Sequence, residues 1–159
     1  MSDSESGGVF SPDETRVLGA VLDELIPARA DGKLPGAGTL GLVARIESAV
    51  RENPDMRPAV TQGLAALEER ARSRGVGSFP ELEREARLEV LNELASSAPA
   101  FLPALIFQTY VGYYEHPRVM QALGLEARPP HPKGYAMDPG DFSLLDPVRK
   151  RPKMYREDS

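Results

Sequence analysis

The chain contains no cysteine, and its 159 residues carry more acid than base. Without cysteine it can form no disulfide, thiolate zinc site, iron–sulfur cluster or haem attachment of the CxxCH type. With 19 Lys and Arg residues against 24 Asp and Glu residues, the formal net charge is −5. A general nucleic-acid-binding protein would instead present a basic face. No apolar run approaches the roughly 20 residues of a transmembrane helix, so we expect neither nucleic-acid binding nor membrane insertion.

The first ten residues, MSDSESGGVF, also lack the features of a targeting signal. They have neither the basic start nor the apolar core of a secretory signal peptide, and they contain no twin arginine. We therefore expect a disordered N-terminus over residues 1–10 and a cytoplasmic protein. Export together with a signal-bearing partner stays open.

Helical periodicity organises residues 11–124. Ser11 and Glu14 have the spacing of a capping box, and Pro12 suits the first helical position. Apolar residues at three-to-four spacing follow, and Pro27 predicts the end of this first helix because the residue before a proline avoids helical geometry.

Two further helix starts are predicted from capping residues. Thr39 is expected to cap a second helix, and Ser78 with Glu81 repeats the capping-box spacing and predicts the start of a fourth. Between them, a third helix is predicted from Met56 to Ser73.

A fifth helix, starting near Pro99, is the most apolar and is expected to occupy the centre of a bundle. Tyr110 and Tyr113 are expected to share one face and to anchor the core, with Tyr114 pointing elsewhere. A short sixth helix from Arg118 to Leu123 completes an all-α, single bundle of five to six helices over residues 11–124.

Residues 125–159 differ in character, since they hold six of the fifteen prolines and almost no periodicity. Such a segment buries too little to fold alone, yet it is too apolar for a solvated linker. We expect an extended, mostly irregular C-terminal arm that docks on the bundle or on a partner.

Metal chemistry has little support. The two histidines, His116 and His131, stand beside prolines and form no HxxxH pair on a helix. Asp138, Asp141 and Asp146 loosely suggest calcium, but the spacing and closing Glu of an EF-hand are missing. We assign no metal ligand in this chain.

Catalysis is similarly weakly indicated. Tyr113, Glu115 and His116 could form an acid–base set, but neighbouring residues of a helix point in different directions, whereas catalytic groups must converge. The glycine-rich stretches GVGS and PGAGTLG lack the register of nucleotide-binding loops. We assign no catalytic or cofactor-binding residue. A stand-alone helical enzyme or small-molecule-binding protein using those three residues remains the alternative.

The stretch RKRPKMYR, residues 149–156, holds five basic residues in eight and no acidic residue. It could bind nucleic acid, remain a solvated tail, or contact an acidic rim on a protein partner. The acidic net charge favours the protein partner over nucleic acid.

Two segments carry a resemblance to a known family. The first is ETRVLGAVLDELIPARADGKLPGAGTLGLVARIE, residues 14–47, and the second is FQTYVGYYEHPRVMQALGLEARPPHPKGY, residues 107–135. Both resemble the gluconate 2-dehydrogenase subunit 3 family, and the likeness extends from about residue 12 to about residue 156.

The resemblance implies a non-catalytic small subunit of a hetero-oligomer. Its partner would be a large flavin-dependent oxidoreductase of the glucose-methanol-choline type, often with a cytochrome subunit as well. The large subunit would hold FAD and oxidise a sugar or alcohol, and the small one would aid its folding, stability or export. Many members begin with a twin-arginine signal, which this sequence lacks, so stabilisation or assembly is the expected role.

We expect the partner to be contacted by the corner after the fifth helix and by the arm. The expected contact residues are Tyr114, His116, Pro117, His131, Pro132, Tyr135, Phe142, Arg149, Arg151 and Tyr155.

Overall fold

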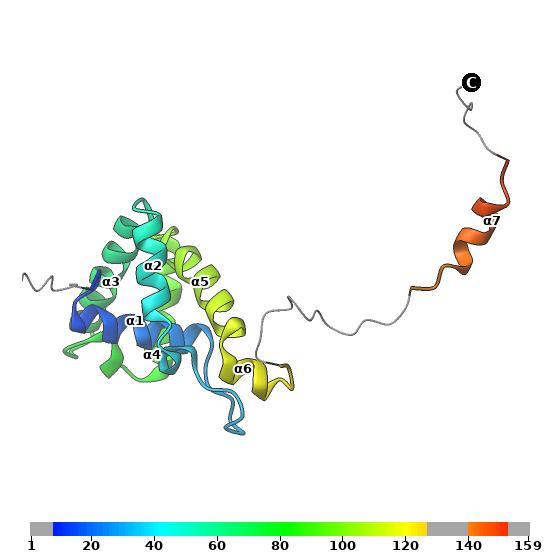
Figure 1. Ribbon diagram of the computed structural model, residues 1–159. Coiled ribbons are helices and arrows are strands. Elements are labelled where there is room, and N and C mark those ends of the chain that lie inside the picture. Colours follow the sequence, from blue (N-terminus) through cyan, green and yellow to red (C-terminus); the bar gives the residue numbers. More distant parts are fainter. Residues whose placement is uncertain (1–7, 127–139, 153–159) are drawn as a thin grey trace, which may run out of the picture. The chain divides into compact units, whose positions relative to one another are not determined.

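The computed structural model describes residues 8–126 and 140–152 (Figure 1). The chain divides into two compact units, Met1–Ala127 and Arg128–Ser159. Every regular element in the described residues is helical, which confirms the predicted all-α class with an irregular C-terminal region.

The first unit consists of α-helices and two short 3-10 helices joined by turns and one longer loop, residues 26–36. In chain order they are α1 Pro12–Leu25, η1 Ala37–Leu40, α2 Val43–Glu52, α3 Met56–Ser73, η2 Phe79–Glu81, α4 Arg84–Ser97, α5 Phe101–Glu115 and α6 Pro117–Ala122.

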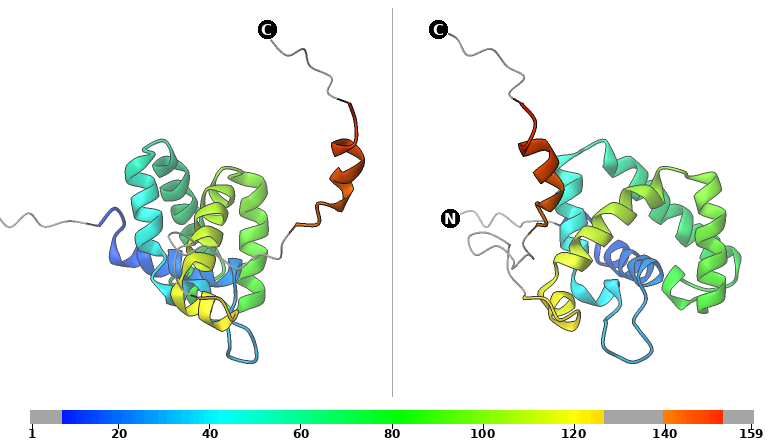
Figure 2. Two further views of the ribbon diagram at one scale, coloured as in Figure 1. Left: turned by 45° about the vertical axis from the view of Figure 1, so that its right-hand side comes forward. Right: turned by 90° about the vertical axis from the view of Figure 1, so that its right-hand side faces the viewer.

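Helix α1 starts as predicted. The Ser11 hydroxyl accepts the N–H of Glu14 at 3.2 Å, and the Glu14 carboxylate accepts the N–H of Ser11 at 2.8 Å. The helix contacts α2, α3, α5 and both 3-10 helices, so it lies inside the bundle (Figure 2). Its inner face is buried through Val17, Leu18, Val21 and Leu22.

A glycine allows α3 and α5 to approach closely. The ring of Phe101, at the start of α5, is fully buried against Gly63 in the middle of α3. A Cβ atom at residue 63 would overlap that ring. Glycine is a poor helix former, so its place here reflects tertiary packing rather than local preference.

The predicted cap of the fourth helix is wrong. Ser78 and Glu81 delimit only the turn η2, and α4 begins at Arg84. The Ser78 hydroxyl and the Phe79 N–H both donate to the carboxylate of Glu68, at 2.9 and 3.0 Å. These bonds hold the turn over α3 with the Phe79 ring fully buried, so long-range contacts override the local capping pattern.

Thr39 also does not cap the second helix. It lies within η1, where its hydroxyl donates to the carbonyl oxygen of Gly36 at 2.8 Å. Gly41 follows with φ of 68°, a left-handed conformation that interrupts helical geometry. Helix α2 therefore starts at Val43.

The N-terminal boundary differs from the predicted one. The N–H of Val9 donates to the Glu47 carboxylate at 3.0 Å, and Phe10 is buried in the core. For residues 8–10 the prediction of disorder is thus wrong, because Phe10 supplies apolar surface that the bundle buries.

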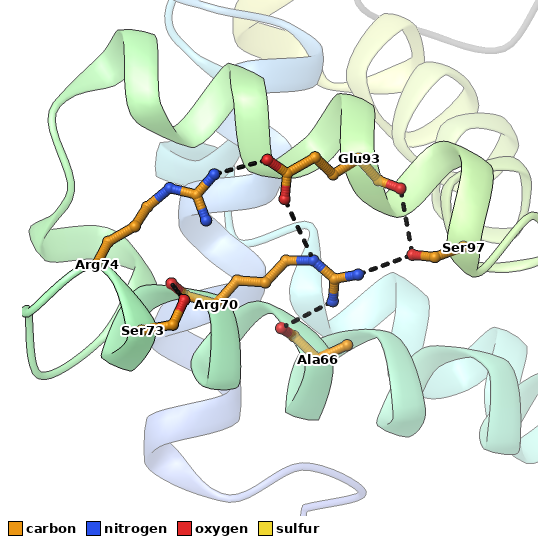
Figure 3. Close-up of polar contacts among 6 residues, drawn as sticks. All are labelled: Ala66, Arg70, Ser73, Arg74, Glu93 and Ser97. Carbon is orange, nitrogen blue, oxygen red and sulfur yellow. Dashed lines mark hydrogen bonds and ion pairs between the residues drawn. The ribbon is translucent and has the colours of Figure 1, made fainter.

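A polar network joins α3 and α4 on the surface (Figure 3). The Glu93 carboxylate lies 2.7 Å from Arg74 Nη2 and 3.5 Å from Arg70 Nε. Arg70 Nη2 also donates to the Ser97 hydroxyl at 2.9 Å. The network ties the two helices together along their exposed side.

In the second unit, residues 140–152 form two short helical turns, η3 Ser143–Leu145 and α7 Asp146–Arg149. The N–H of Ser143 donates to the Asp141 carboxylate at 3.0 Å and holds the pKa of that carboxyl below its usual value. Asp146 pairs with Arg149 at 3.4 Å. These local bonds start and support the turns.

Candidate partner-binding site

The two segments that carry the family resemblance meet at Tyr113. Its hydroxyl donates a 2.9 Å hydrogen bond to the carbonyl oxygen of Pro35, and its side chain is only 2% exposed. Burial raises the pKa of this hydroxyl above its usual value, and the adjacent Tyr114 adds to the rise. The tyrosine thus fastens the loop after α1 to the last turn of α5.

Asp23 fastens the same loop from the other side. Its carboxylate accepts the N–H of Gly38 at 2.9 Å. Desolvation raises the pKa of this carboxyl above its usual value, although the bond from Gly38 acts in the opposite direction. A Cβ atom at residue 36 or 38 would collide with the Asp23 side chain. The glycines of the PGAG sequence therefore allow close approach to α1 and are not a phosphate-binding loop.

Helix α2 and the end of α5 are joined by Arg45 and Glu115, whose side chains form a 2.9 Å ion pair. The Arg45 side chain lies over Gly112, where a Cβ atom would come within 2.7 Å of Arg45 Cδ. Arg45 Nε is covered and finds no acceptor in the described part of the chain. The pair marks one edge of the outer surface of α5.

The tyrosines of α5 are distributed between the core and the surface differently from the prediction. Tyr113 enters the core, but Tyr110 is 46% exposed and lies beside exposed Tyr114, with ring centroids 6.2 Å apart. Successive residues turn by about 100° around a helix, so Tyr113 lies close to the buried Thr109 stripe whereas Tyr110 lies well away from it. Tyr110 is therefore not the core anchor that we expected.

One side of α5 is apolar and exposed. Helical geometry puts five residues on the side opposite the buried stripe of Phe101, Leu105, Thr109 and Gly112. We call these residues the α5 outer face: Pro103, Ile106, Phe107, Tyr110 and Tyr114.

Phe107 is the most exposed of the large hydrophobic residues of the outer face, at 66%. It borders two hollows, of 240 and 390 Å³, which share only Phe107 and Gln108 in their linings. The smaller hollow is bounded by polar α2 residues, including Arg45 and Glu52. The larger runs along Met56, Ala59, Ala100, Pro103 and Ala104.

Sequence reasoning missed Ile106 and Phe107 as surface residues. The sequence did contain a sign of this apolar surface, because no charged residue occurs from Leu94 to Tyr114. A helix that is apolar all round is either buried all round or covered by another molecule. We interpreted it as the bundle centre, but among the described residues of the first unit one side of the helix is exposed.

The predicted contact residues of the first unit lie together at the end of α5. Tyr114 is exposed, and Pro117 is the exposed first residue of α6. The His116 ring nitrogen Nδ1 accepts the N–H of Arg118 at 3.2 Å and so caps α6. His116 has a structural role in this corner, and Tyr114 is continuous with the outer face.

Three predicted contact residues, Phe142, Arg149 and Arg151, lie in the second unit and are exposed. Four other predicted contact residues lie outside the described residues: His131, Pro132, Tyr135 and Tyr155. Asp138 of the possible calcium motif also lies outside them.

The alternative acid–base set does not share a common site. The hydroxyl of Tyr113 donates to Pro35, Glu115 pairs with Arg45, and His116 caps α6. Within residues 8–126 and 140–152, no three His, Asp or Glu side chains gather as a metal-ligand set. These contacts account for all three groups as structural residues.

Among the described helices, none is by itself long and apolar enough to cross a membrane. Helices α4 and α5 pass that test together by length and composition alone, with a bend of 118° between them.

Comparison with known proteins identifies one family. The model of the family described as gluconate 2-dehydrogenase subunit 3 matches residues 12–129, which is well over half of the chain. No curated protein and no solved structure matches the sequence. The matched range contains α1 to α6, including the Tyr113–Pro35 junction and the α5 outer face. The chain belongs to the gluconate 2-dehydrogenase subunit 3 family.

Proposed function

We propose that the chain is a non-catalytic accessory subunit that binds and stabilises, or helps to assemble, a large FAD-dependent sugar or alcohol oxidoreductase. The observation that carries the proposal is the family match over residues 12–129, because the family is named for a subunit of a dehydrogenase. In this proposal FAD and the chemistry belong to the large subunit, and a cytochrome subunit can complete the complex.

The surface of the bundle supports a binding role. Isolated exposed apolar residues are ordinary, but a contiguous apolar patch on a small protein is typical of an interaction site. The α5 outer face is such a patch, and two of its five residues are tyrosines, which are enriched at interfaces.

Co-expression tests the proposal. A candidate partner, a large flavin-dependent dehydrogenase from the same organism, would be produced with and without the chain, and the soluble yield and the ratio of flavin to protein absorbance would be measured. We expect both quantities to rise when the chain is present, and we expect the two proteins to co-purify. Equal yield and equal flavin content in both cultures would refute a stabilising or assembly role.

A further inference from the structure

We infer that the α5 outer face is the surface on which the large flavin-dependent subunit docks, with Phe107 as the central anchor. This inference rests on the proposed function and adds to it the location and chemistry of the interface. It starts from the uncharged stretch Leu94–Tyr114, whose α5 part packs inward on one side and is exposed on the other among the described residues of the first unit.

The tyrosine end of the outer face is supported from beneath. Tyr113 is fixed in the core by its bond to Pro35, and the Tyr114 ring rests against it with centroids 5.3 Å apart. Tyr110 in turn lies beside Tyr114. Because these tyrosine rings already contact one another, Tyr110 and Tyr114 should lose less side-chain entropy on binding than unsupported side chains would.

The size of the face suits a heteromeric interface. An aromatic side chain presents about 150–250 Å², so the half-exposed residues Ile106, Phe107, Tyr110 and Tyr114 together offer roughly 400 Å². A partner in a standard interface contributes about 800 Å². The face can thus form the apolar centre of such an interface, with the linings of the two hollows as its rim.

The rim indicates the chemistry of the occupant. Arg45 is already paired with Glu115, whereas Glu52 and Asp55 in the linings form no ion pair with other described residues. The docking surface of the large subunit should therefore present an apolar side chain for the 390 Å³ hollow beside Phe107 and a Lys or Arg side chain near the two acids.

A second copy of this chain suits the rim less well. Each copy would bring the same two acids to the interface, and each carries a net charge of −5. Like charges brought together at an interface oppose association. The large subunit implied by the family is the occupant to which we commit.

Alanine substitution tests the anchor. The full-length chain would be co-expressed with the tagged large subunit used in the yield experiment, and the amount of chain retained per large subunit would be measured. Phe107→Ala should lower this amount at least about tenfold, since interface anchors typically contribute 2 kcal/mol or more. The matched control is Leu88→Ala, at an exposed apolar residue of α4, and it should leave the amount unchanged.

Charge reversal tests the rim. Glu52→Lys should weaken retention, whereas Glu89→Lys, at an exposed residue of α4, should not. Because all these side chains are exposed, the thermal unfolding midpoints of the variants should match that of the wild type, which separates lost binding from lost folding.

The possible outcomes are distinct. If the wild type and Phe107→Ala co-purify equally, the inference is overturned while the proposed function stands. If the wild type does not co-purify, the inference is overturned, and the proposed function is overturned with it when the soluble yield and flavin content are also unchanged. If Phe107→Ala only converts a homodimer into a monomer, with retention unchanged, the face is a self-association surface and the inference is again overturned.

Discussion

The hydroxyl of Tyr113 and the carbonyl oxygen of Pro35, 78 positions apart in the chain, are joined by a 2.9 Å hydrogen bond in the interior of the bundle. The bond links the loop after α1 to the last turn of α5, which also carries Tyr114 of the outer face. Removal of this bond should lower both the stability of the fold and the order of this corner.

Tyr113→Phe is expected to lower the free energy of unfolding by about 1–2 kcal/mol, because it leaves the buried Pro35 carbonyl without its donor. Urea unfolding followed by circular dichroism measures the change. Tyr110→Phe is the control, since the Tyr110 hydroxyl lies on the exposed side of the same helix. Equal losses in the two variants would contradict the assigned role of the bond.

Asp23 should make the free energy of unfolding depend on pH. Its carboxyl has a pKa raised above 3.8, mainly by desolvation, so the native state binds the proton more tightly than the unfolded chain. The contribution of Asp23 is therefore most favourable below the unfolded pKa and declines as the pH rises through the native pKa.

The measurement compares the wild type with Asp23→Asn, whose amide oxygen can still accept the N–H of Gly38. As the pH rises from about 4 through the native pKa, the stability of the wild type relative to this variant should fall. A relative stability that rises with pH over this range would show that the hydrogen bond, and not desolvation, dominates.

Two glycines in helix interiors should respond in opposite directions to alanine. Gly19→Ala in α1 places Cβ in ordinary contact, 3.9 Å from the Gly38 carbonyl oxygen, and should stabilise the protein by up to about 1 kcal/mol. In Gly63→Ala in α3, the added Cβ atom would overlap the fully buried Phe101 ring. The overpacking should cost about 1–3 kcal/mol and outweigh the gain in helix propensity, so this variant should be destabilised. Thermal unfolding distinguishes them, and stabilisation by Gly63→Ala would disprove the close packing of α3 on α5.

Glu24 and Glu93 each bridge two arginines, but they differ in burial. The Glu24 side chain is 3% exposed and pairs with Arg87 at 2.7 Å and with Arg84 at 3.3 Å. The Glu93 side chain is 49% exposed in its network with Arg70 and Arg74. Burial decides how strongly water and salt screen such pairs.

Glu24→Gln should therefore cost about 2–4 kcal/mol, because Arg87 loses a buried partner. Glu93→Gln should cost less than about 1 kcal/mol, and this smaller loss should vanish in molar salt. Urea titrations at low and high salt give both values, and equal losses would show that burial does not control these networks.

Removal of residues 128–159 tests the arm. Residues 140–152 expose Phe142 and Val148, ahead of a basic stretch, so we predict that the arm adds a second contact to the partner. The shortened chain should keep the unfolding midpoint of the first unit and co-purify less well with the large subunit. Co-purification at full affinity would reject the arm as a contact and would leave the inference about α5 intact.

Much of the helical architecture could be predicted from local signals. The capping box at Ser11, the periodicity of α1 and the bounds of α3 at Met56 and Ser73 all agree with the structure. The predicted helix cap at Ser78 was wrong because the carboxylate of Glu68, in another helix, accepts the hydrogen bonds of this segment. Capping motifs describe local hydrogen bonding, so they cannot reveal a competing partner elsewhere in the chain.

The division of the tyrosines needed the tertiary structure. A stretch without charge, from Leu94 to Tyr114, contains no polar side to distinguish inside from outside. Periodicity relates Tyr110, Tyr113 and Tyr114 to one another, but it does not say which of them another helix covers.

By itself, the sequence determined that the chain forms helices, where several of them begin, and which family it belongs to. These properties depend on backbone preferences and on residues close together in the chain. Only the tertiary structure decided that Tyr113 lies inside while Phe107, Tyr110 and Tyr114 lie outside. Burial depends on which helices pack against α5, and that is set by contacts between segments far apart in the sequence.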